Sequence, residues 1–468
     1  MSTQEAGRNG WQGVAAAQAE LRQADPERVL ISAWDIGKDV HMWFVRTVAG
    51  EVLVAPTKVA SLASGYQQMR QALDGLLASG RFDLAVFGHE PTGVYHEALS
   101  QNLLQDYGAH CGGEAQPVVR YRWLNPALVK QERQRSTQRQ RKTDKIDVAA
   151  ISQLLADGQG YPAPALTDAE SALRLTLRHV QHLVKRQRRL AIGLLRTLDR
   201  LWPGALGNAS AYQRTHPELP PLLHLVDTHP LQRQRVRVLL EHCADPYALR
   251  TLGVEGIRSL FSAHDERCGL QTAQHIYAVA QQSLLPPPSL CAVLAAQVQA
   301  DFGQFRQLEA QIAAGETQAQ ALLPDTCGQV LTTVPGVGPA QAMRYLSGLG
   351  DPDRFATARQ VWAYAGFDPN QADSGNRRHD GTISHRGSPY LRSTLYQIGY
   401  LTALHCADCT RLYVQGRQRG LVKTLAIIHV ANKANRILFA LLKTQEPYRS
   451  PLSAAEADHW RSLLSQVR

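Results

Sequence analysis

The chain has 468 residues, enough for two or three domains with sizeable hydrophobic cores. Its 50 Lys and Arg residues outnumber its 40 Asp and Glu residues, and the net charge of +10 fits either a polyanionic partner or a basic protein without one. No uninterrupted stretch of about 18 apolar residues occurs, so neither a membrane-spanning helix nor a membrane partner is predicted. The polar segment from Met1 to about Pro26 lacks the apolar core of a signal peptide and predicts a disordered tail on a cytoplasmic protein.

Strands and helices alternate between about Arg28 and Gly160. The predicted strands cover residues 29–34, 41–46, 51–55, 84–90 and 117–121, and the predicted helices cover residues 61–78, 95–107, 126–138 and 143–156. This order, β-β-β-α-β-α-β-α-α, is typical of ribonuclease-H-like (RuvC-like) domains, in which helices cover both faces of a mixed sheet.

Four acidic residues lie at the ends of predicted strands or at the start of a predicted helix. Asp35 and Glu90 each close a predicted strand, whereas Asp144 and Asp147 lie three apart at the start of a predicted helix. Residues three apart share a helix face, with Cβ atoms about 5–6 Å from each other, and strand-end carboxylates can approach that face. Close carboxylates repel unless a cation neutralises them, and oxygen ligands select a hard ion. The four residues predict a site for Mg²⁺, or Mn²⁺ in its place, of the kind that cuts or joins phosphodiesters.

A long helical segment follows a Gly/Pro break at residues 158–164. Thr167 and Glu170 form a predicted capping box, and apolar residues then recur mostly three or four positions apart. The opposite face is basic and contains Arg174, Arg178, Lys185, Arg186, Arg188, Arg189 and Arg196. This face is either a solvated surface or one that meets nucleic acid. A second apolar stripe over residues 294–312 predicts the returning arm of a coiled-coil hairpin.

The final domain starts near Cys327. Its Val334-Pro-Gly-Val-Gly-Pro-Ala340 segment is similar to the turn of a helix-hairpin-helix, whose backbone amides can hold a phosphate. Helices are predicted over residues 340–347, 356–365, 388–405 and 422–442. A polar loop at 368–386 holds Ser374 next to Gly375. From its surroundings alone, Ser374 is either a nucleophile or a simple turn residue.

These motifs, taken in order, resemble the DEDD transposases of insertion sequences, which are related to pilin-gene DNA invertases. The match covers about residues 29–157 and 327–446. It consists of Trp34-Asp35-Ile-Gly-Lys38, Glu90-Pro-Thr-Gly-Val-Tyr95, Asn125-Pro126 through Lys130, Lys142-Thr143-Asp144-Lys-Ile-Asp147, Pro335-Gly-Val-Gly338, Asp353-Arg-Phe355, Ala363-Tyr-Ala-Gly366 with Pro369, Ser374-Gly375, and Gly387 through Leu391-Arg392. Pro91 replaces the alanine that is usual in the second of these motifs.

The resemblance implies a division of the chain into five parts. These are a disordered tail (1–27), a RuvC-like DEDD domain (28–160), a coiled-coil and helical insertion (161–326), a mostly helical transposase domain with the catalytic serine (327–447) and a second tail (448–468). Members of this family are serine recombinases guided by a bridge RNA. The implied partners are therefore target DNA, donor DNA and guide RNA, bound by a homo-oligomer, a dimer of dimers, at the bacterial nucleoid.

The same resemblance assigns roles to individual residues. Ser374 is expected to attack phosphorus and form a 5′-phosphoserine while the metal held by the four acids positions the phosphate. Contacts with the nucleic-acid backbone are expected from four basic residues: Lys142, Arg377, Arg378 and Arg392. Two rival interpretations stay open: a Holliday-junction resolvase-like nuclease that uses the acids and water alone, and a nucleic-acid-binding remnant without catalysis.

Overall fold

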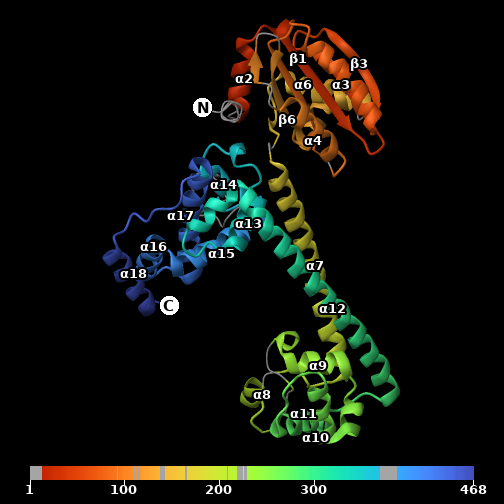
Figure 1. Ribbon diagram of the computed structural model, residues 1–468, viewed down its shortest axis with the longest axis vertical. Coiled ribbons are helices and arrows are strands. Elements are labelled where there is room, and N and C mark those ends of the chain that lie inside the picture. Colours follow the sequence, from red (N-terminus) through yellow and green to blue (C-terminus); the bar gives the residue numbers. More distant parts are fainter. Residues whose placement is uncertain are drawn as a thin grey trace, which may run out of the picture. The chain divides into compact units, whose positions relative to one another are not determined.

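The computed structural model describes residues 13–91, 93–108, 111–113, 116–137, 143–163, 166–207, 209–218, 225, 229–368 and 387–467. The chain forms two compact units, one made of residues 1–171 with 323–468 and the other of residues 172–322. Figure 1 labels the helices and strands that are discussed below. The finer domain boundaries predicted from the sequence stay predictions.

A seven-stranded mixed sheet forms the N-terminal part of the first unit. Its order is β3 (Val52–Ala60), β2 (Val40–Thr47), β1 (Val29–Ile36), β4 (Leu84–His89), β6 (Gln116–Trp123) and β5 (Cys111–Gly113), with β7 (Tyr161–Pro162) also paired to β6. Strand β4 runs parallel to both β1 and β6, whereas β2 runs antiparallel to β1 and β3. The mixed α/β domain is therefore confirmed, and its strand order agrees with the ribonuclease-H-like prediction. Strands β5 and β7 were not predicted because they are only three and two residues long.

Helices cover both faces of this sheet. Helices α5 (Pro126–Thr137) and α6 (Asp144–Ala156) pack on one face with Val29, Ile31 and Ala33 of β1, and α3 (Ala63–Leu77) and α4 (His96–Tyr107) pack on the other with Leu30 and Trp34. The alternation follows from the two-residue period of a strand. Gly88 of β4 faces α6, because a Cβ atom there would stand 2.6 Å from Leu155 Cδ2.

The two segments predicted as tails both contain a helix, and the structure corrects the predicted disorder of the first segment over residues 13–23. Helix α2 (Gly13–Gln23) covers part of the first segment. Its Glu20 carboxylate lies 3.0 Å from Arg120 of β6, and Leu21 packs against the core on the α6 side of the sheet. Helix α18 (Ala454–Val467) lies in the second segment and buries Leu464. Apolar side chains three or four apart stabilise each helix once a core is present to receive them.

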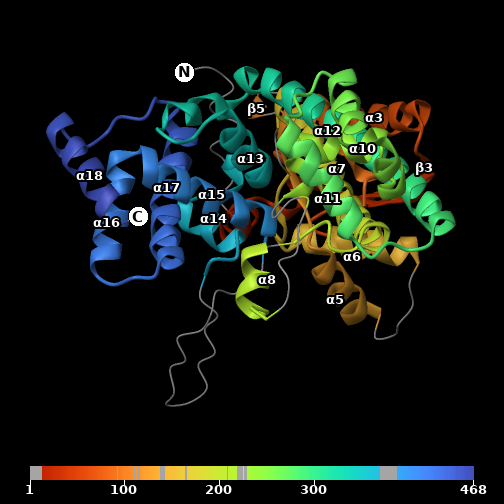
Figure 2. The same ribbon diagram turned by 90° about the horizontal axis from the view of Figure 1, so that it is seen from below.

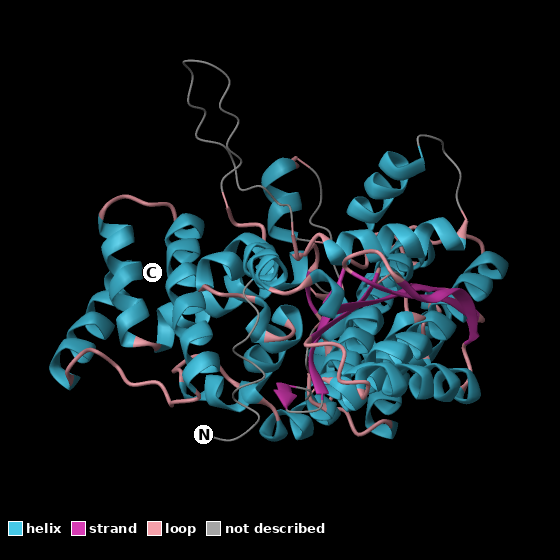
Figure 3. Cartoon of the chain, turned by 90° about the horizontal axis from the view of Figure 1, so that it is seen from above, coloured by secondary structure: helices cyan, strands magenta, loops and turns pink. Residues whose placement is uncertain are grey.

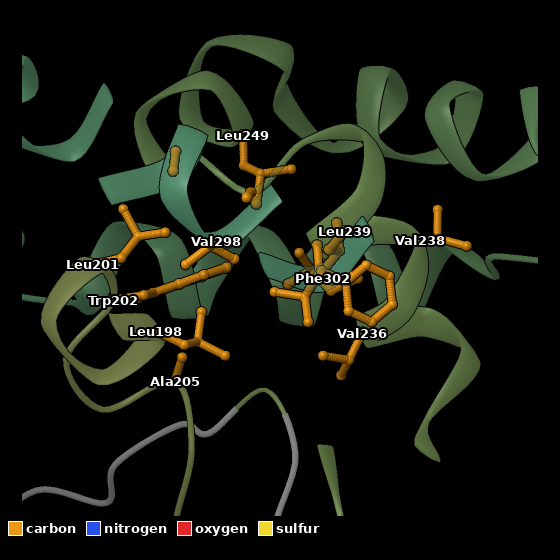
Figure 4. Packing of buried hydrophobic residues seen from close by; sticks show 14 of the residues in the cluster. Leu198, Leu201, Trp202, Ala205, Val236, Val238, Leu239, Leu249, Val298 and Phe302 are labelled. Carbon is orange, nitrogen blue, oxygen red and sulfur yellow. The ribbon is translucent and has the colours of Figure 1, made fainter. Parts of the chain in front are cut away.

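Every secondary-structure element described in the second unit is a helix. The long helices α7 (Asp168–Leu201) and α12 (Pro288–Leu322) pack side by side, as predicted for a hairpin (Figure 1, Figure 2). Between them the chain forms α8 (Ala209–Thr215), α9 (Gln234–His242), α10 (Pro246–Ala263) and α11 (Leu270–Gln282). Helices α9, α10 and α11 share one apolar core with Trp202 and with Phe302 of α12 (Figure 4). The chain between α7 and α12 therefore forms helices that share their apolar core with the end of α7 and the start of α12.

The capping box at the start of α7 is confirmed. The Thr167 amide donates to Glu170 Oε2 over 3.0 Å, and the Glu170 amide donates to Thr167 Oγ1 over 3.2 Å. These two bonds satisfy amides that the first helical turn leaves without a partner.

The C-terminal part of the first unit is built from helices, whereas the strands lie in the N-terminal part (Figure 3). Its helices are α13 (Pro339–Leu349), α14 (Ala358–Tyr364), α15 (Pro389–His405), α16 (Ala407–Gln418), α17 (Lys423–Thr444) and α18. Helices α13, α14, α15 and α17 confirm the four predicted helices, and α16 was not predicted.

Helix α17 is the one described helix that is long and apolar enough to cross a membrane, with a mean hydropathy of 1.4. It also packs tightly within the helical domain. A Cβ atom on Gly399 of α15 would stand 2.7 Å from the Ala431 side chain of α17, and Val430 and Leu438 are fully buried. Its apolar character is that of a core helix.

The turn before α13 depends on one glycine. Gly336 has φ of 90°, and a Cβ atom there would stand 2.7 Å from the Leu401 carbonyl oxygen. We expect Gly336→Ala to lower the free energy of unfolding by about 2–4 kcal/mol, since both strain and a backbone clash oppose it. Gly338→Ala is the matched control, because Gly338 has φ of −80° and its Cβ would meet only Gln341 Oε1 at 3.6 Å. Denaturant unfolding measures both changes, and equal stabilities would contradict the role given to Gly336.

Candidate catalytic site

Asp35 and Glu90 occupy neighbouring positions at the carboxyl ends of β1 and β4, which are central strands of the sheet. Trp34 of β1 pairs with His89 of β4 in parallel register, so Asp35 and Glu90 are the next residues on each chain. Adjacent strands lie about 4.8 Å apart, and residues in register point to the same side. Both carboxylates therefore project from the face that α6 covers, and both are partly exposed.

Asp144 and Asp147 lie in the first turn of α6, as predicted. Thr143 caps this helix, and its hydroxyl oxygen accepts a hydrogen bond from the Ile146 amide over 3.3 Å. Carboxylates at this end of a helix interact favourably with its dipole. Asp144 is exposed, whereas Asp147 is buried and pairs with Arg133 of α5, with 2.9 Å between Arg133 Nη1 and Asp147 Oδ1.

The structure thus forms two pairs of carboxylates, one on the sheet and one on the helix that covers it. Within the described residues, no group of three or more His, Cys, Asp or Glu side chains lies close enough to hold a metal ion. The union of the two pairs into a single metal site stays a prediction. The donor set itself fits Mg²⁺, because all four side chains offer only carboxylate oxygens.

Four of the predicted site residues lie outside the described part of the chain. These are Lys142, Ser374, Arg377 and Arg378. The structure does describe both ends of the segment that carries Ser374. We call these ends the neck, which comprises residues 364–367 and 387–388.

Hydrogen bonds hold the two sides of the neck together. The Ser388 amide donates to the Tyr364 carbonyl oxygen over 2.9 Å, and Arg392 Nη1 donates to the Ala365 carbonyl oxygen over 2.9 Å. Gly387 has φ of 137°, and a Cβ atom there would overlap the Tyr364 carbonyl oxygen, so glycine is required. Arg392 was predicted to contact phosphate. It is partly buried and binds the neck, and the phosphate contact stays a prediction.

A buried polar cluster that the sequence did not reveal lies behind Glu90. His89 is fully buried on the α4 side of the sheet, with Nδ1 2.9 Å from Tyr121 Oη and Nε2 3.1 Å from Ser100 Oγ. Burial lowers the pKa of His89 well below its ordinary value, so the ring is neutral. The cluster fixes the end of β4 and therefore the backbone from which Glu90 projects. The strand alternation of His89 with Glu90 was the only sequence signal for it.

The basic face predicted on α7 is exposed. Between Ser171 and Leu201 the helix carries eight Lys and Arg residues and one acidic residue, Asp199. Its exposed basic residues are Arg178, Lys185, Arg186, Arg188, Arg189, Arg196 and Arg200. The partner arm α12 has only Arg306 against three acidic residues. The excess of basic over acidic residues in the hairpin therefore lies on α7.

Two family models match the chain. A transposase model of the DEDD type named for IS110 matches residues 33–203, and a model described as the transposase IS116/IS110/IS902 family matches residues 328–415. The first range contains all four acids, and the second contains Ser374 and Arg392.

Individual proteins show the same similarity. A probable family 20 transposase from Pseudomonas aeruginosa is 35% identical over 150 residues, which are 31% of this chain and 44% of that protein. An uncharacterized 43.6 kDa protein of insertion element IS110 from Streptomyces coelicolor is 29% identical over 320 residues, 67% of this chain and 73% of that protein. A pilin gene-inverting protein from Moraxella bovis is 27% identical over 121 residues, 25% of this chain and 38% of that protein. The match thus spans less than half the length of the first and third relatives.

Proposed function

Because the chain belongs to the DEDD transposases of the IS116/IS110/IS902 family, we propose that it cuts and rejoins DNA through a serine nucleophile. Membership of this family, which the motifs predicted, is confirmed by the two model matches and by transposase and pilin gene-inverting relatives. One observation carries the proposal: the two matched ranges hold, in chain order, the four acids and then the serine.

In the proposed reaction, the Ser374 hydroxyl oxygen attacks the scissile phosphorus. A bond forms between phosphorus and the serine oxygen, the bond to the 3′ oxygen breaks, and the proton lost by serine is balanced by the one that the 3′ oxygen gains. One phosphodiester bond is exchanged for another, so strand joining by the reverse step needs no ATP. Mg²⁺ bound by the carboxylates would position the phosphate and stabilise the charge that develops on its oxygens.

Asp35 and Glu90 are well placed to bind a metal ion without a change in backbone conformation. Each residue directly follows the last pair of the parallel β1–β4 ladder in the middle of the sheet, so little reorganisation is needed when a charged group binds. Asp144 and Asp147 are placed by a capped helix that packs on this sheet. We propose that four copies of the chain, as a dimer of dimers, assemble around the two DNAs.

The exposed basic face of α7 supports a nucleic-acid partner beyond the cut DNA. A row of Lys and Arg on a single helix binds phosphate backbone without reading bases. We propose that this face, together with the basic residues at 130–142, holds a guide RNA by its shape and backbone. Base pairing of that RNA would then select the DNA targets, which leaves the protein to recognise the heteroduplex and perform the chemistry.

Removal of RNA tests this proposal directly. Purified protein is incubated with Mg²⁺ and labelled target and donor DNA, with its cognate RNA or after ribonuclease treatment, and joined products are resolved on a gel. We expect joined product only with RNA, and a guide altered in its pairing segment should redirect the product to the matching DNA. Equal joining after complete RNA removal would overturn the guide role while leaving the serine chemistry intact.

A further inference from the structure

The Asp353-Arg354-Phe355 motif has no part in the chemistry proposed above, yet its arginine occupies an unusual position. Arg354 ends the short 3₁₀ helix η5 (Pro352–Arg354) and is partly buried. Its guanidinium carbon lies 5.6 Å from the ring centre of Tyr161, 5.5 Å from that of Phe355 and 5.6 Å from that of Tyr364. A planar cation among three aromatic rings is favoured most where water is partly excluded.

Tyr161 belongs to the carboxylate-bearing sheet. It lies in β7, which pairs with the end of β6, and its ring is 6.3 Å from that of Trp123. Trp123 in turn pairs with His89, the residue before Glu90. Tyr161 therefore lies at the same end of the strands as Glu90, which follows β4.

Tyr364 belongs to the neck of the Ser374 segment. Its carbonyl oxygen accepts the Ser388 amide, and its ring lies 5.4 Å from that of Phe355. An ion pair with α17 also holds η5 in place, because Lys443 Nζ lies 2.6 Å from Asp353 Oδ1. Arg354 is thus held in place at the point where the neck and the sheet approach each other.

We propose that Arg354 is a positioning residue that fixes the neck of the Ser374 segment to the carboxylate-bearing sheet of the same chain. We name Tyr161, Arg354, Phe355 and Tyr364 the arginine clasp. The inference deepens the proposed function and rests on it, since the neck carries the segment that holds Ser374.

Arg354 and Tyr161 contribute different chemical properties to the arginine clasp. Arg354 must be planar and charged to face three rings, so lysine, a compact ammonium, replaces it only in part. Tyr161 needs only its ring, so Tyr161→Phe should preserve the clasp and Tyr161→Leu should remove it. Tyr161→Phe is therefore the matched control, and Tyr161→Leu remains informative if Arg354→Ala fails to fold.

The test combines hydrogen exchange with strand joining in the full-length protein. Exchange of the Ser388 and Phe367 amides reports on the neck without any need for activity. We expect Arg354→Ala and Tyr161→Leu to accelerate this exchange by about tenfold or more, with exchange in β1 and β4 unchanged. Strand joining should fall by about 10²-fold, as when a reacting group is misplaced by about 1 Å. Arg354→Lys should lie between, and Tyr161→Phe should match the wild type.

The double variant provides the sharpest check. Arg354→Ala combined with Tyr161→Leu should exchange and react no worse than either single variant, because both remove the same interaction. Unchanged exchange at the neck in Arg354→Ala, or additive effects in the double variant, would overturn the clasp. If wild-type protein formed no covalent DNA product, the proposed function would fail, and the exchange measurements would still decide whether the clasp exists.

Discussion

Ser374→Ala is expected to abolish the covalent protein–DNA adduct and to reduce strand joining by a factor on the order of 10⁴–10⁶. The loss is large because alanine removes the only oxygen that, in the proposed reaction, conserves the energy of the broken phosphodiester. Protein, cognate RNA, Mg²⁺ and end-labelled DNA are incubated together, and a denaturing gel separates free DNA from DNA bound covalently to protein.

Ser388→Ala is the matched control for this experiment. Ser388 is also close to the segment in question, but its hydroxyl oxygen caps α15 by accepting the Leu391 amide over 3.2 Å. Its replacement should cost about 1 kcal/mol of stability and leave the adduct intact. If DNA were cut without an adduct, and equally well by Ser374→Ala, the serine would have no catalytic role. The four acids with water, as in a junction-resolving nuclease, would then explain the activity.

Local patterns in the sequence were sufficient for most elements of the fold. Alternation placed β1, β2 and β4, and a three-to-four residue period placed α6, α7 and α12, because each of these elements is long enough to show its buried face. Strands β5 and β7 escaped because two or three residues carry no period. Helix α2 escaped because its polar composition hides the few side chains, such as Leu21, that reach the core.

For the candidate site, the sequence located the four acids but not the contacts that they and their neighbours make. Strand ends and an i,i+3 spacing located Asp35, Glu90, Asp144 and Asp147 without any knowledge of tertiary structure. The sequence could not reveal that Arg133 pairs with Asp147 or that Arg392 binds the neck, since both contacts join side chains to partners on other elements. The arginine clasp is still harder to predict from the sequence, because Tyr161 and Arg354 lie 193 positions apart in the chain.

Asp144→Asn is expected to lower strand cleavage by about 10²-fold or more, and to raise the Mg²⁺ concentration needed for half-maximal cleavage. Even the outer partners of metal ligands are worth 10- to 100-fold in activity, as an order of magnitude, so a direct ligand should cost at least as much. EDTA should abolish cleavage by the wild type, and added Mg²⁺ should restore it. Initial cleavage rates over a Mg²⁺ titration measure both effects.

The choice of Asp144 over its neighbour follows from burial. The Asp147 side chain is 8% exposed and pairs with Arg133, so its replacement would leave a guanidinium without its partner and cost about 1–3 kcal/mol of stability. A loss of activity in Asp147→Asn would then have two causes. Asp144 is exposed, and its replacement by an isosteric amide changes charge with little effect on packing.

Asp157→Asn completes the comparison, because Asp157 is an exposed acid at the opposite end of α6. The same loss of one negative charge on the same helix should leave both the cleavage rate and the Mg²⁺ titration unchanged. If Asp144→Asn and Asp157→Asn behaved alike, the effect would be one of net charge on DNA or RNA binding, and the carboxylates of α6 would not be metal ligands. A shift confined to Asp144→Asn would show that a carboxylate at the start of α6 binds the metal, as the predicted union of the two carboxylate pairs requires.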